Sequence, residues 1–285
     1  MSRSSMLRRM LFAAAFSAAL FVPMASANAG AATFTASSGN LRATFSYTGH
    51  FPQAKNERLV ITESNKVLYD RPVSSKWCGS RCWPLQLTAH SAALHLVHLQ
   101  SSGPASVVLG LYSGGAHCCS IEQVFSFDAH TMRFEKIEHN FGDPGVRVVP
   151  IGPDADSVFL SADSSFAYAF TDYAASGMPI EILSVSRGRF IDVTRSFPNL
   201  IARDATLWRN AFDESARSHY QDTVGLAAAW AADEELLGHV AAVKQFLARQ
   251  AAAGHLNSAI SPEEPSGQRF VVALQRFLRQ HGYVK

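Results

Sequence analysis

The sequence predicts an α+β protein, with a mostly antiparallel β domain followed by a small C-terminal helical domain. Up to about residue 200, apolar residues alternate with polar ones in short runs separated by glycine and proline, a pattern typical of strands and turns. From Ile201 onward, the apolar residues recur every three or four positions, which is the period of a helix that buries one face. We therefore predict a β domain over residues 30–200 and a helical domain over residues 201–285.

The strands are predicted from alternation and from the turns that separate them. Between residues 41 and 47, every second side chain is apolar, which is typical of a half-buried strand. Glu63, Ser64 and Asn65 predict a hairpin between two strands, and Arg187-Gly188 predicts another. The remaining strands are expected at residues 94–99, 107–112, 121–127, 133–137, 180–185 and 190–193.

Four helices are predicted in the C-terminal domain. Asp204 is a suitable N-cap for the first, and the second includes residues 224–230. The third is expected to begin near Asp233, because acids suit a helix N-terminus, and to end at Gly254. The last stops at Gly282, a residue type common just after a helix. Acidic and basic residues balance in this domain at nine each, so it is not predicted to be a membrane-surface module.

The first 29 residues have the pattern of a secretory signal peptide. Arg3, Arg8 and Arg9 precede an apolar run at residues 10–22, and two overlapping A-x-A cleavage sites follow, ending at Ala27 and Ala29. The alternative is a membrane anchor, but the run is too short to span a bilayer comfortably. We therefore predict a periplasmic or secreted protein whose mature chain has no transmembrane segment.

The charge of the chain argues against nucleic acid as a partner. The formal net charge is +2, and removal of three arginines with the signal peptide brings the mature chain to about −1. The sequence contains no cluster of lysine and arginine that could follow a phosphate backbone. Nothing in the sequence calls for a cofactor.

Four cysteines form the most distinctive feature of the chain. Cys78 and Cys82 lie between two tryptophans, whereas Cys118 and Cys119 follow a glycine turn and His117. Because an exported chain meets oxidising conditions, we predict disulfides. The favoured pairing joins Cys78 and Cys82 to Cys118 and Cys119, and each link would contribute roughly 3 to 4 kcal/mol. A Cys118–Cys119 bond ranks low, because its ring would span one peptide bond.

Metal binding is the alternative interpretation of the same residues. His117, Cys118 and Cys119 are ligands that suit Zn²⁺ or Cu⁺, and Cys78 and Cys82 could complete a tetrahedral set. A redox-active thiol pair is a further alternative, although the chain has no C-x-x-C sequence. Asp154 and Asp156 could bind Ca²⁺, but an ordinary polar turn is the favoured interpretation there.

One part of the chain resembles a known family. Residues 96–119, which end in Gly-Gly-Ala-His-Cys-Cys, resemble a unit of the exported FG-GAP and VCBS-type repeat proteins, related to integrin-alpha-like propeller blades. The acids of that family's calcium loop are absent here at residues 100–106, so the resemblance does not imply calcium binding at this loop. Residues 148–159 resemble a second, degraded copy, and the resemblance extends over about residues 40–200. It implies at most three blade-like sheets, in an open stack or a sandwich, and a binding or structural role.

The predicted function is that of an exported, non-enzymatic binding or structural protein that recognises a protein or a component of the cell envelope. Trp77, Trp83 and Tyr112, close to the cysteines, are the candidate contact residues, and packing in the core is the competing interpretation. The chain lacks the G-x-S-x-G, H-E-x-x-H and P-loop motifs of common enzymes. A hydrolase acting on envelope material is the enzymatic alternative, and it predicts a cleft that holds a histidine and a carboxyl group of shifted pKa.

Overall fold

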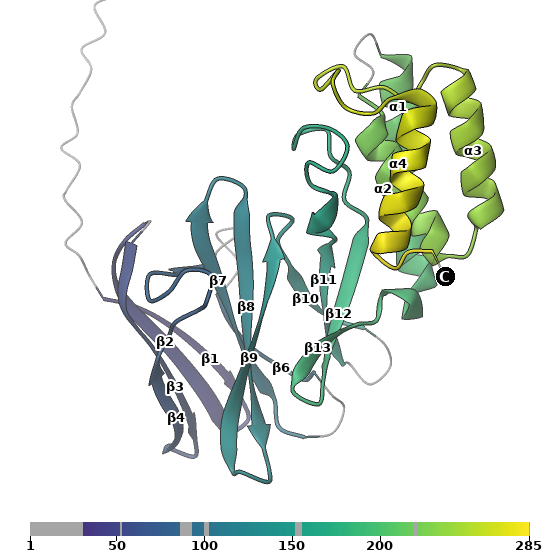
Figure 1. The fold of residues 1–285 in the computed structure, drawn as a ribbon. Helices are drawn as coiled ribbons and strands as arrows, with labels where there is room; N and C mark the ends of the chain where they lie inside the picture. Colours follow the sequence, from purple (N-terminus) through teal and green to yellow (C-terminus); the bar gives the residue numbers. More distant parts are fainter. Residues whose placement is uncertain are drawn as a thin grey trace, which may run out of the picture.

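A computed structural model describes residues 31–51, 53–85, 93–99, 103–151, 156–218 and 222–284. The predicted signal peptide lies outside these residues. Antiparallel sheets occupy the N-terminal part and four α-helices the C-terminal part, which confirms the predicted α+β class (Figure 1). No helix in the described ranges is both long and apolar enough to cross a membrane.

The strands form three antiparallel sheets that follow one another along the chain. The first sheet has the order β1 (Ala32–Ser38), β2 (Leu41–His50), β3 (Gln53–Glu63) and β4 (Lys66–Pro72). The second contains β5 (Trp83–Pro84), β7 (Ser106–Gly115), β8 (Cys118–Asp128) and β9 (Arg133–Gly142), with β6 (Leu94–Val97) also paired to β7. The third contains β10 (Arg147–Pro150), β11 (Ser157–Ala162), β12 (Ile180–Ser186) and β13 (Arg189–Asp192).

Both predicted hairpins are confirmed. Ser64 and Asn65 turn the chain between β3 and β4 with φ angles of 48° and 68°, and Arg187 and Gly188 do so between β12 and β13 with 49° and 70°. Strand β1 was not predicted as a separate strand, because its small side chains produce a weak hydrophobic pattern. Strand β10 is only four residues long and ends in a proline, so it carried no signal either.

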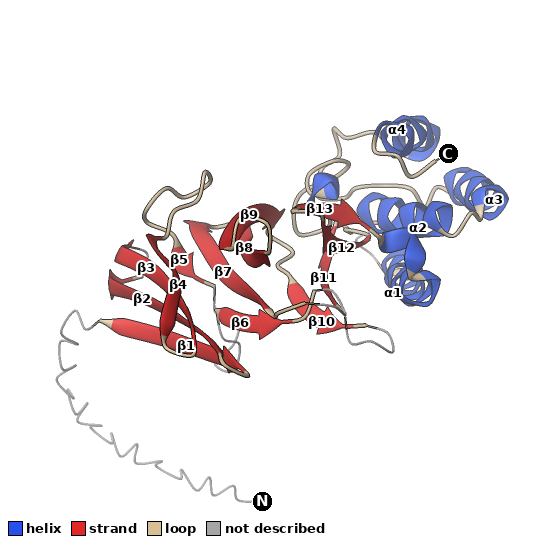
Figure 2. Ribbon diagram, turned by 90° about the horizontal axis from the view of Figure 1, so that it is seen from below, coloured by secondary structure: helices blue, strands red, loops and turns tan. Residues whose placement is uncertain are grey.

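The three sheets stack face to face (Figure 2). Phe45 and Ile61 of the first sheet pack against Leu109 and Phe125 of the second. The opposite face of the second sheet packs against the third in a separate core, which includes Val108, Val124, Phe141, Phe159 and Leu183. Because β7 is covered on both faces, its sequence is a continuous apolar run. The described residues thus form three sheet layers with two separate cores between them.

The helices form a compact group beside the third sheet. They are α1 (Pro198–Arg217), α2 (Val224–Leu236), α3 (Val240–Ala252) and α4 (Gly267–Gln280). Helix α2 lies in the middle and is buried along most of its length, so its alanines allow the other helices to approach closely (Figure 2). Gly282 follows α4 with a φ of 77°, as predicted for a residue just after a helix.

Two of the predicted helix starts are wrong. Helix α1 begins at Pro198, a residue well suited to a first helical turn, so Asp204 lies inside the helix rather than at its cap. Asp233 lies in the last turns of α2, and α3 begins only at Val240. Burial raises the pKa of Asp233 to about 10, so a neutral carboxyl group stands near the helix C-terminus and does not oppose the helix dipole, which the sequence alone did not show.

The helices are attached to the third sheet by apolar and polar contacts. Ile180 and Ile182 of β12 pack against Ile201 of α1. The guanidinium group of Arg195 donates hydrogen bonds to the carbonyl oxygens of Leu236 at 2.9 Å and Tyr283 at 2.7 Å. The loop between β11 and β12 also reaches the helices, because its buried phenylalanines belong to the helical core. This loop is therefore held by the third sheet at its ends and by the helices along its buried phenylalanines.

Candidate functional site

The β7–β8 turn places the distinctive cysteine sequence at one end of the second sheet. The chain can close this turn because Gly115 has no side chain: a Cβ atom there would lie 2.9 Å from the carbonyl oxygen of Cys118. The amide of Cys119 donates a hydrogen bond of 2.7 Å to the hydroxyl oxygen of Ser113. The turn is thus fixed by close backbone approach and by a side-chain acceptor.

We expect Ser113→Ala to lower the free energy of unfolding by about 1 to 3 kcal/mol, because it leaves the amide of a buried cysteine without its acceptor. Urea unfolding would measure the loss. Ser113→Thr keeps the hydroxyl group and serves as the matched control. Equal stability of the alanine variant and the wild type would show that water replaces the serine at no cost.

The structure pairs the cysteines within each turn, so the favoured prediction of links between the turns is wrong. Cys78 is bonded to Cys82, and Cys118 to Cys119. Paired backbone hydrogen bonds between Ser75 and Gly79 close the first turn and bring the Cα atoms of its cysteines to 5.1 Å. Each disulfide therefore stabilises a local loop, and neither joins the two turns.

This pairing can be tested by peptide mapping without reductant. Cleavage by trypsin after Arg81 and by chymotrypsin after Tyr112 separates the three cysteine-containing segments. We expect the Cys78 and Cys82 fragments to remain linked to each other. The fragment with Cys118 and Cys119 should appear alone, lighter than its reduced form by a pair of hydrogens. Any covalent link between this fragment and the other two would contradict the structure.

The disulfide also bears on the metal alternative. With Cys118 and Cys119 joined, their sulfur atoms are not thiolates, which Zn²⁺ and Cu⁺ require. No group of three or more histidine, cysteine or acidic side chains suited to a metal ion occurs in the ranges that the structure describes. Metal binding at His117 would need reduction of the disulfide first, and it stays a prediction.

A groove runs across this end of the molecule. One cavity of about 290 Å³ is lined by residues of the β7–β8 turn, of the loop after β9 and of the loop between β11 and β12: His117, Cys118, Cys119, Asn140, Gly142, Asp143, Pro144, Ser164, Ala167, Tyr168 and Tyr173. A second cavity of about 400 Å³ is lined by Phe51, Trp83, Pro84, Leu85, Tyr112, Ser120 and Asp143. Because Asp143 lines both, we treat them as one site and name it the Asp143 groove.

Aromatic rings line both halves of the Asp143 groove. The ring of Tyr173 lies 4.3 Å from that of His117 and 5.5 Å from that of Tyr168. In the other half, Trp83 lies 5.5 Å from Phe51 in an edge-to-face arrangement. Tyr168 and Phe51 are 57% and 58% exposed. The groove therefore presents apolar ring surface to solvent on both sides of its centre.

The centre of the groove is polar. The Asp143 carboxylate lies 4.0 Å from Nδ1 of His117, and the two side chains are 29% and 53% exposed. Both keep atoms free to accept or donate hydrogen bonds to a ligand. In contrast, the hydroxyl group of Tyr112 donates to the carbonyl oxygen of Gly115, so this tyrosine contributes its ring to the groove and its hydroxyl to the turn.

Two of the three predicted contact residues line the groove. Trp83 and Tyr112 face each other across the β5–β7 pair. Trp77 does not line it: the residue packs against the core between the first two sheets, and the amine of Lys76 lies 4.3 Å from its ring centre. Of the predicted calcium ligands, Asp154 falls outside the described residues.

Sequence reasoning missed the other groove residues. Asp143 stands in Gly142-Asp143-Pro144-Gly145, which has the composition of an ordinary turn, and Phe51 follows a strand end. Tyr168 and Tyr173 belong to a loop without hydrophobic periodicity. Only the aromatic run at residues 166–170 offered a signal, and it lies within the span that resembles the repeat units.

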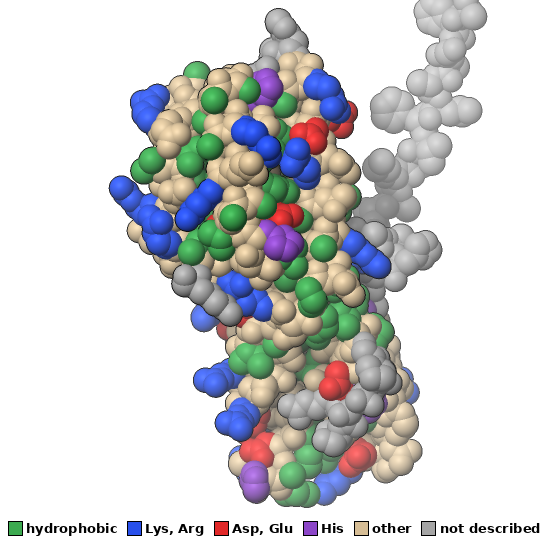
Figure 3. Space-filling view, turned by 90° about the vertical axis from the view of Figure 1, so that its right-hand side faces the viewer, with side chains coloured by type: hydrophobic (Ala, Val, Ile, Leu, Met, Phe, Trp, Pro, Cys, Tyr) green, Lys and Arg blue, Asp and Glu red, His purple; other side chains and the backbone are tan. Residues whose placement is uncertain are grey.

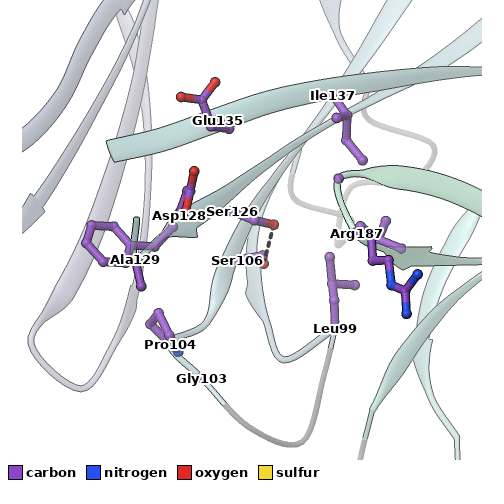
Figure 4. Close-up of a pocket in the computed structure, with 13 residues that line it drawn as sticks. Leu99, Gly103, Pro104, Ser106, Ser126, Asp128, Ala129, Glu135, Ile137 and Arg187 are labelled. Atoms are coloured by element: carbon purple, nitrogen blue, oxygen red, sulfur yellow. Dashed lines mark hydrogen bonds between the residues drawn. The ribbon is translucent and has the colours of Figure 1, made fainter. Parts of the chain in front are cut away.

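A further cavity, of about 560 Å³, opens between the second and third sheets at their other end. Ser106 and Ser126 share a hydrogen bond of 2.9 Å within it, and Leu99 and Ile137 provide apolar walls. Figure 4 shows the carboxylate of Glu135 and the guanidinium of Arg187 directed away from the two serines. Because twisted sheets diverge at their ends, such a space arises from packing alone. Because the Glu135 and Arg187 side chains do not converge on the two serines, we place the candidate site in the Asp143 groove.

A smaller hollow bears on the hydrolase alternative. It is lined by Asp163, Glu181, Asp192 and His281 beside the helices, and its volume is about 140 Å³. Burial, with smaller contributions from the two aspartates, raises the pKa of Glu181 to about 7. A histidine and a shifted carboxyl group thus line one hollow, but it is too small to enclose a substrate the size of a drug molecule. The hydrolase hypothesis stays a prediction.

Comparison with known proteins gives one partial match. The chain is 26% identical over 153 residues to a protein of Synechocystis sp. that is named as a probable thylakoid lumen protein. The match covers 52% of this chain and 45% of the relative, so the chain spans less than half of that protein. No family model and no solved structure matches the chain. The resemblance to FG-GAP and VCBS-type repeats therefore stays a prediction.

Proposed function

We propose that this protein is an exported, non-enzymatic binding protein that holds a glycan of the cell envelope in the Asp143 groove. The observation that carries the proposal is the order of groups along the groove, in which aromatic rings flank a central carboxylate and imidazole. Concave sites with apolar walls and a few polar groups are the usual form of a ligand site.

A glycan matches this order of groups. A sugar ring has an apolar face of C–H groups and a rim of hydroxyl groups. The C–H groups carry a small positive charge, so they are attracted to the negative face of an aromatic ring. The hydroxyl groups can donate to the Asp143 carboxylate and exchange hydrogen bonds with His117. Two adjacent cavities offer room for more than one sugar along a chain.

An acidic peptide fits the same groove less well. Peptides in grooves are held through backbone hydrogen bonds to a strand edge, by an amphipathic helix in an apolar trough, by basic groups, or as proline-rich segments between aromatic rings. The described lining contains neither lysine nor arginine. It also contains one carboxyl group, whereas most glycosidases use a pair of them. These features favour binding of a glycan over its cleavage and over recognition of an acidic peptide.

Three observations support export. The sequence predicts a signal peptide, all four cysteines are paired in disulfides, and the relative from Synechocystis is named for a lumenal compartment. Disulfides persist mainly in oxidising compartments outside the cytosol. The resemblance to repeat proteins also points to export, because those proteins are exported. It further implies a binding or structural role.

Sedimentation with insoluble peptidoglycan sacculi would test the proposal. We expect the protein purified after export to pellet with the sacculi and to be released by soluble peptidoglycan fragments. The variant Asp143→Asn should bind the sacculi at least about tenfold more weakly, since a hydrogen bond to a charged group contributes about 1.5 to 3 kcal/mol. Met132→Ala, which truncates an exposed side chain in a distant turn, is the control. Failure of the wild type to pellet would refute glycan recognition.

A further inference from the structure

We propose that the outer side of α4, with the exposed cations of the neighbouring α3 on its flanks, docks on a membrane surface of anionic phospholipids. This inference is independent of the proposed glycan site, because none of the residues involved lines the Asp143 groove. The inference depends on where the acidic and basic residues of the helical domain lie, because their numbers are equal.

Helices α3 and α4 carry basic residues but no acidic ones. Lys244 and Arg249 belong to α3, and Arg269, Arg276 and Arg279 belong to α4. All five side chains are exposed, and we refer to them together as the basic face. Figure 3 shows lysine and arginine side chains spread over the helical end of the molecule, with few acidic ones between them.

The sequence of α4 separates its apolar and basic residues onto opposite sides. Phe270, Leu274 and Leu278 are fully buried against the helical core. The three arginines stand at spacings of seven and three residues, so they lie on the opposite side of the helix. Val272 lies on the same side and is 51% exposed. The outer side of α4 thus offers three guanidinium groups around one apolar side chain.

The acids of the domain do not neutralise the basic face. Asp213 pairs with Arg209 at 3.1 Å on α1. Asp233 is buried in α2. Glu235, also in α2, lies close enough to Lys244 for this lysine to moderate the rise that burial causes in its pKa, so Lys244 is the one cation of the face with an acid beside it. Glu263 and Glu264, in the loop before α4, are the acids closest in sequence to the arginines. Against Arg249 and the three arginines of α4, these two acids leave an excess of positive charge.

The shape of the basic face favours a lipid surface over a soluble polyanion. None of its five residues lines a cavity described above, so these cavities offer no channel beside the basic face that could hold a polyanionic chain. Each basic residue close to an anionic bilayer strengthens binding by about fivefold, and the exposed valine can enter the interface. Such binding weakens as salt screens the charges.

Vesicle co-sedimentation tests this inference. We expect the protein purified after export to bind vesicles that contain phosphatidylglycerol at low salt, and to bind neither pure phosphatidylcholine vesicles nor any vesicles at high salt. The triple variant Arg269→Gln/Arg276→Gln/Arg279→Gln should bind at least about tenfold more weakly. Circular dichroism would verify that the variant remains folded.

The matched control removes the same charge from the other end of the molecule. Lys55→Gln/Lys66→Gln/Arg71→Gln changes three exposed cations of the first sheet and should bind vesicles like the wild type. Equal losses in both triple variants would indicate a general charge effect and overturn the docking surface. Absence of vesicle binding by the wild type, or binding to soluble polyphosphate alone, would overturn it as well. None of these outcomes depends on glycan binding.

Discussion

Replacement of Tyr173 by alanine is expected to weaken glycan binding by at least about tenfold. Tyr173 stands between His117 and Tyr168, with ring distances of 4.3 Å and 5.5 Å, and is the centre of one aromatic half of the groove. A ring that covers a ligand excludes water from apolar surface worth about 1.5 to 3 kcal/mol. Titration of soluble peptidoglycan fragments by isothermal calorimetry would measure the change.

Two further variants sharpen this expectation. Tyr173→Phe keeps the ring and should bind nearly as well as the wild type, since stacking needs the ring and not the hydroxyl group. Met132→Ala truncates a side chain that is 68% exposed and far from the groove, and it should have no effect. If Tyr173→Ala bound as tightly as the wild type while remaining folded, the aromatic half of the groove would not be part of the site.

Asp233 is expected to make the free energy of unfolding fall as the pH rises. Burial, together with the neighbouring Asp204 carboxyl, raises the pKa of Asp233 to about 10. The unfolded chain releases this proton near pH 4, so between about pH 4 and pH 10 the folded state holds one proton more. The contribution of Asp233 to the free energy of unfolding is fully present below about pH 4. Between about pH 4 and pH 10 it declines by about 1.4 kcal/mol per pH unit.

The variant Asp233→Asn removes this titration. Its amide is neutral at every pH, so its stability should decline less with pH than that of the wild type. From pH 5 to pH 8, the difference in unfolding free energy between variant and wild type should shift by about 4 kcal/mol in favour of the variant. Urea unfolding at several pH values would measure it. Glu214→Gln, at an exposed position on α1, is the control.

A shift of the same size in Glu214→Gln would show that net charge, rather than the buried carboxyl, causes the effect. If Asp233→Asn and the wild type lost stability in parallel, Asp233 would be ionised in the folded protein. That outcome would require a neighbouring cation, and the structure places the acid Asp204 beside it instead. The measurement therefore decides the protonation state of this buried pair.

The elements of the fold could be predicted from local patterns. The run at residues 107–111 is continuously apolar because β7 is covered by sheets on both faces, and the turn at Ser64 and Asn65 has residue types that tolerate positive φ angles. Helix starts were less predictable. Pro198 starts α1 before the apolar period becomes evident, and Asp233 resembles a start signal although it is buried inside the preceding helix.

The candidate site could be predicted only in part. Trp83 and Tyr112 stood out because they flank the cysteines, but Asp143, Tyr168 and Tyr173 reach the groove through loops that are distant in the sequence. The disulfide pairing depended on the shape of two turns, and loop length alone favoured the wrong solution. The basic face was hidden for a similar reason, since a balanced count of charges does not show that the acids are buried, paired or on other elements.

The central claim is that the Asp143 groove binds an envelope glycan, and chemical-shift mapping tests it most directly. Soluble peptidoglycan fragments would be titrated into isotope-labelled protein, and the amide signals followed by NMR. We predict that the shifts concentrate on His117, Asp143, Tyr168 and Tyr173, with Trp83 on the other side of the groove. Absence of any shift, or shifts centred on the cavity around Leu99 and Ile137, would contradict the account.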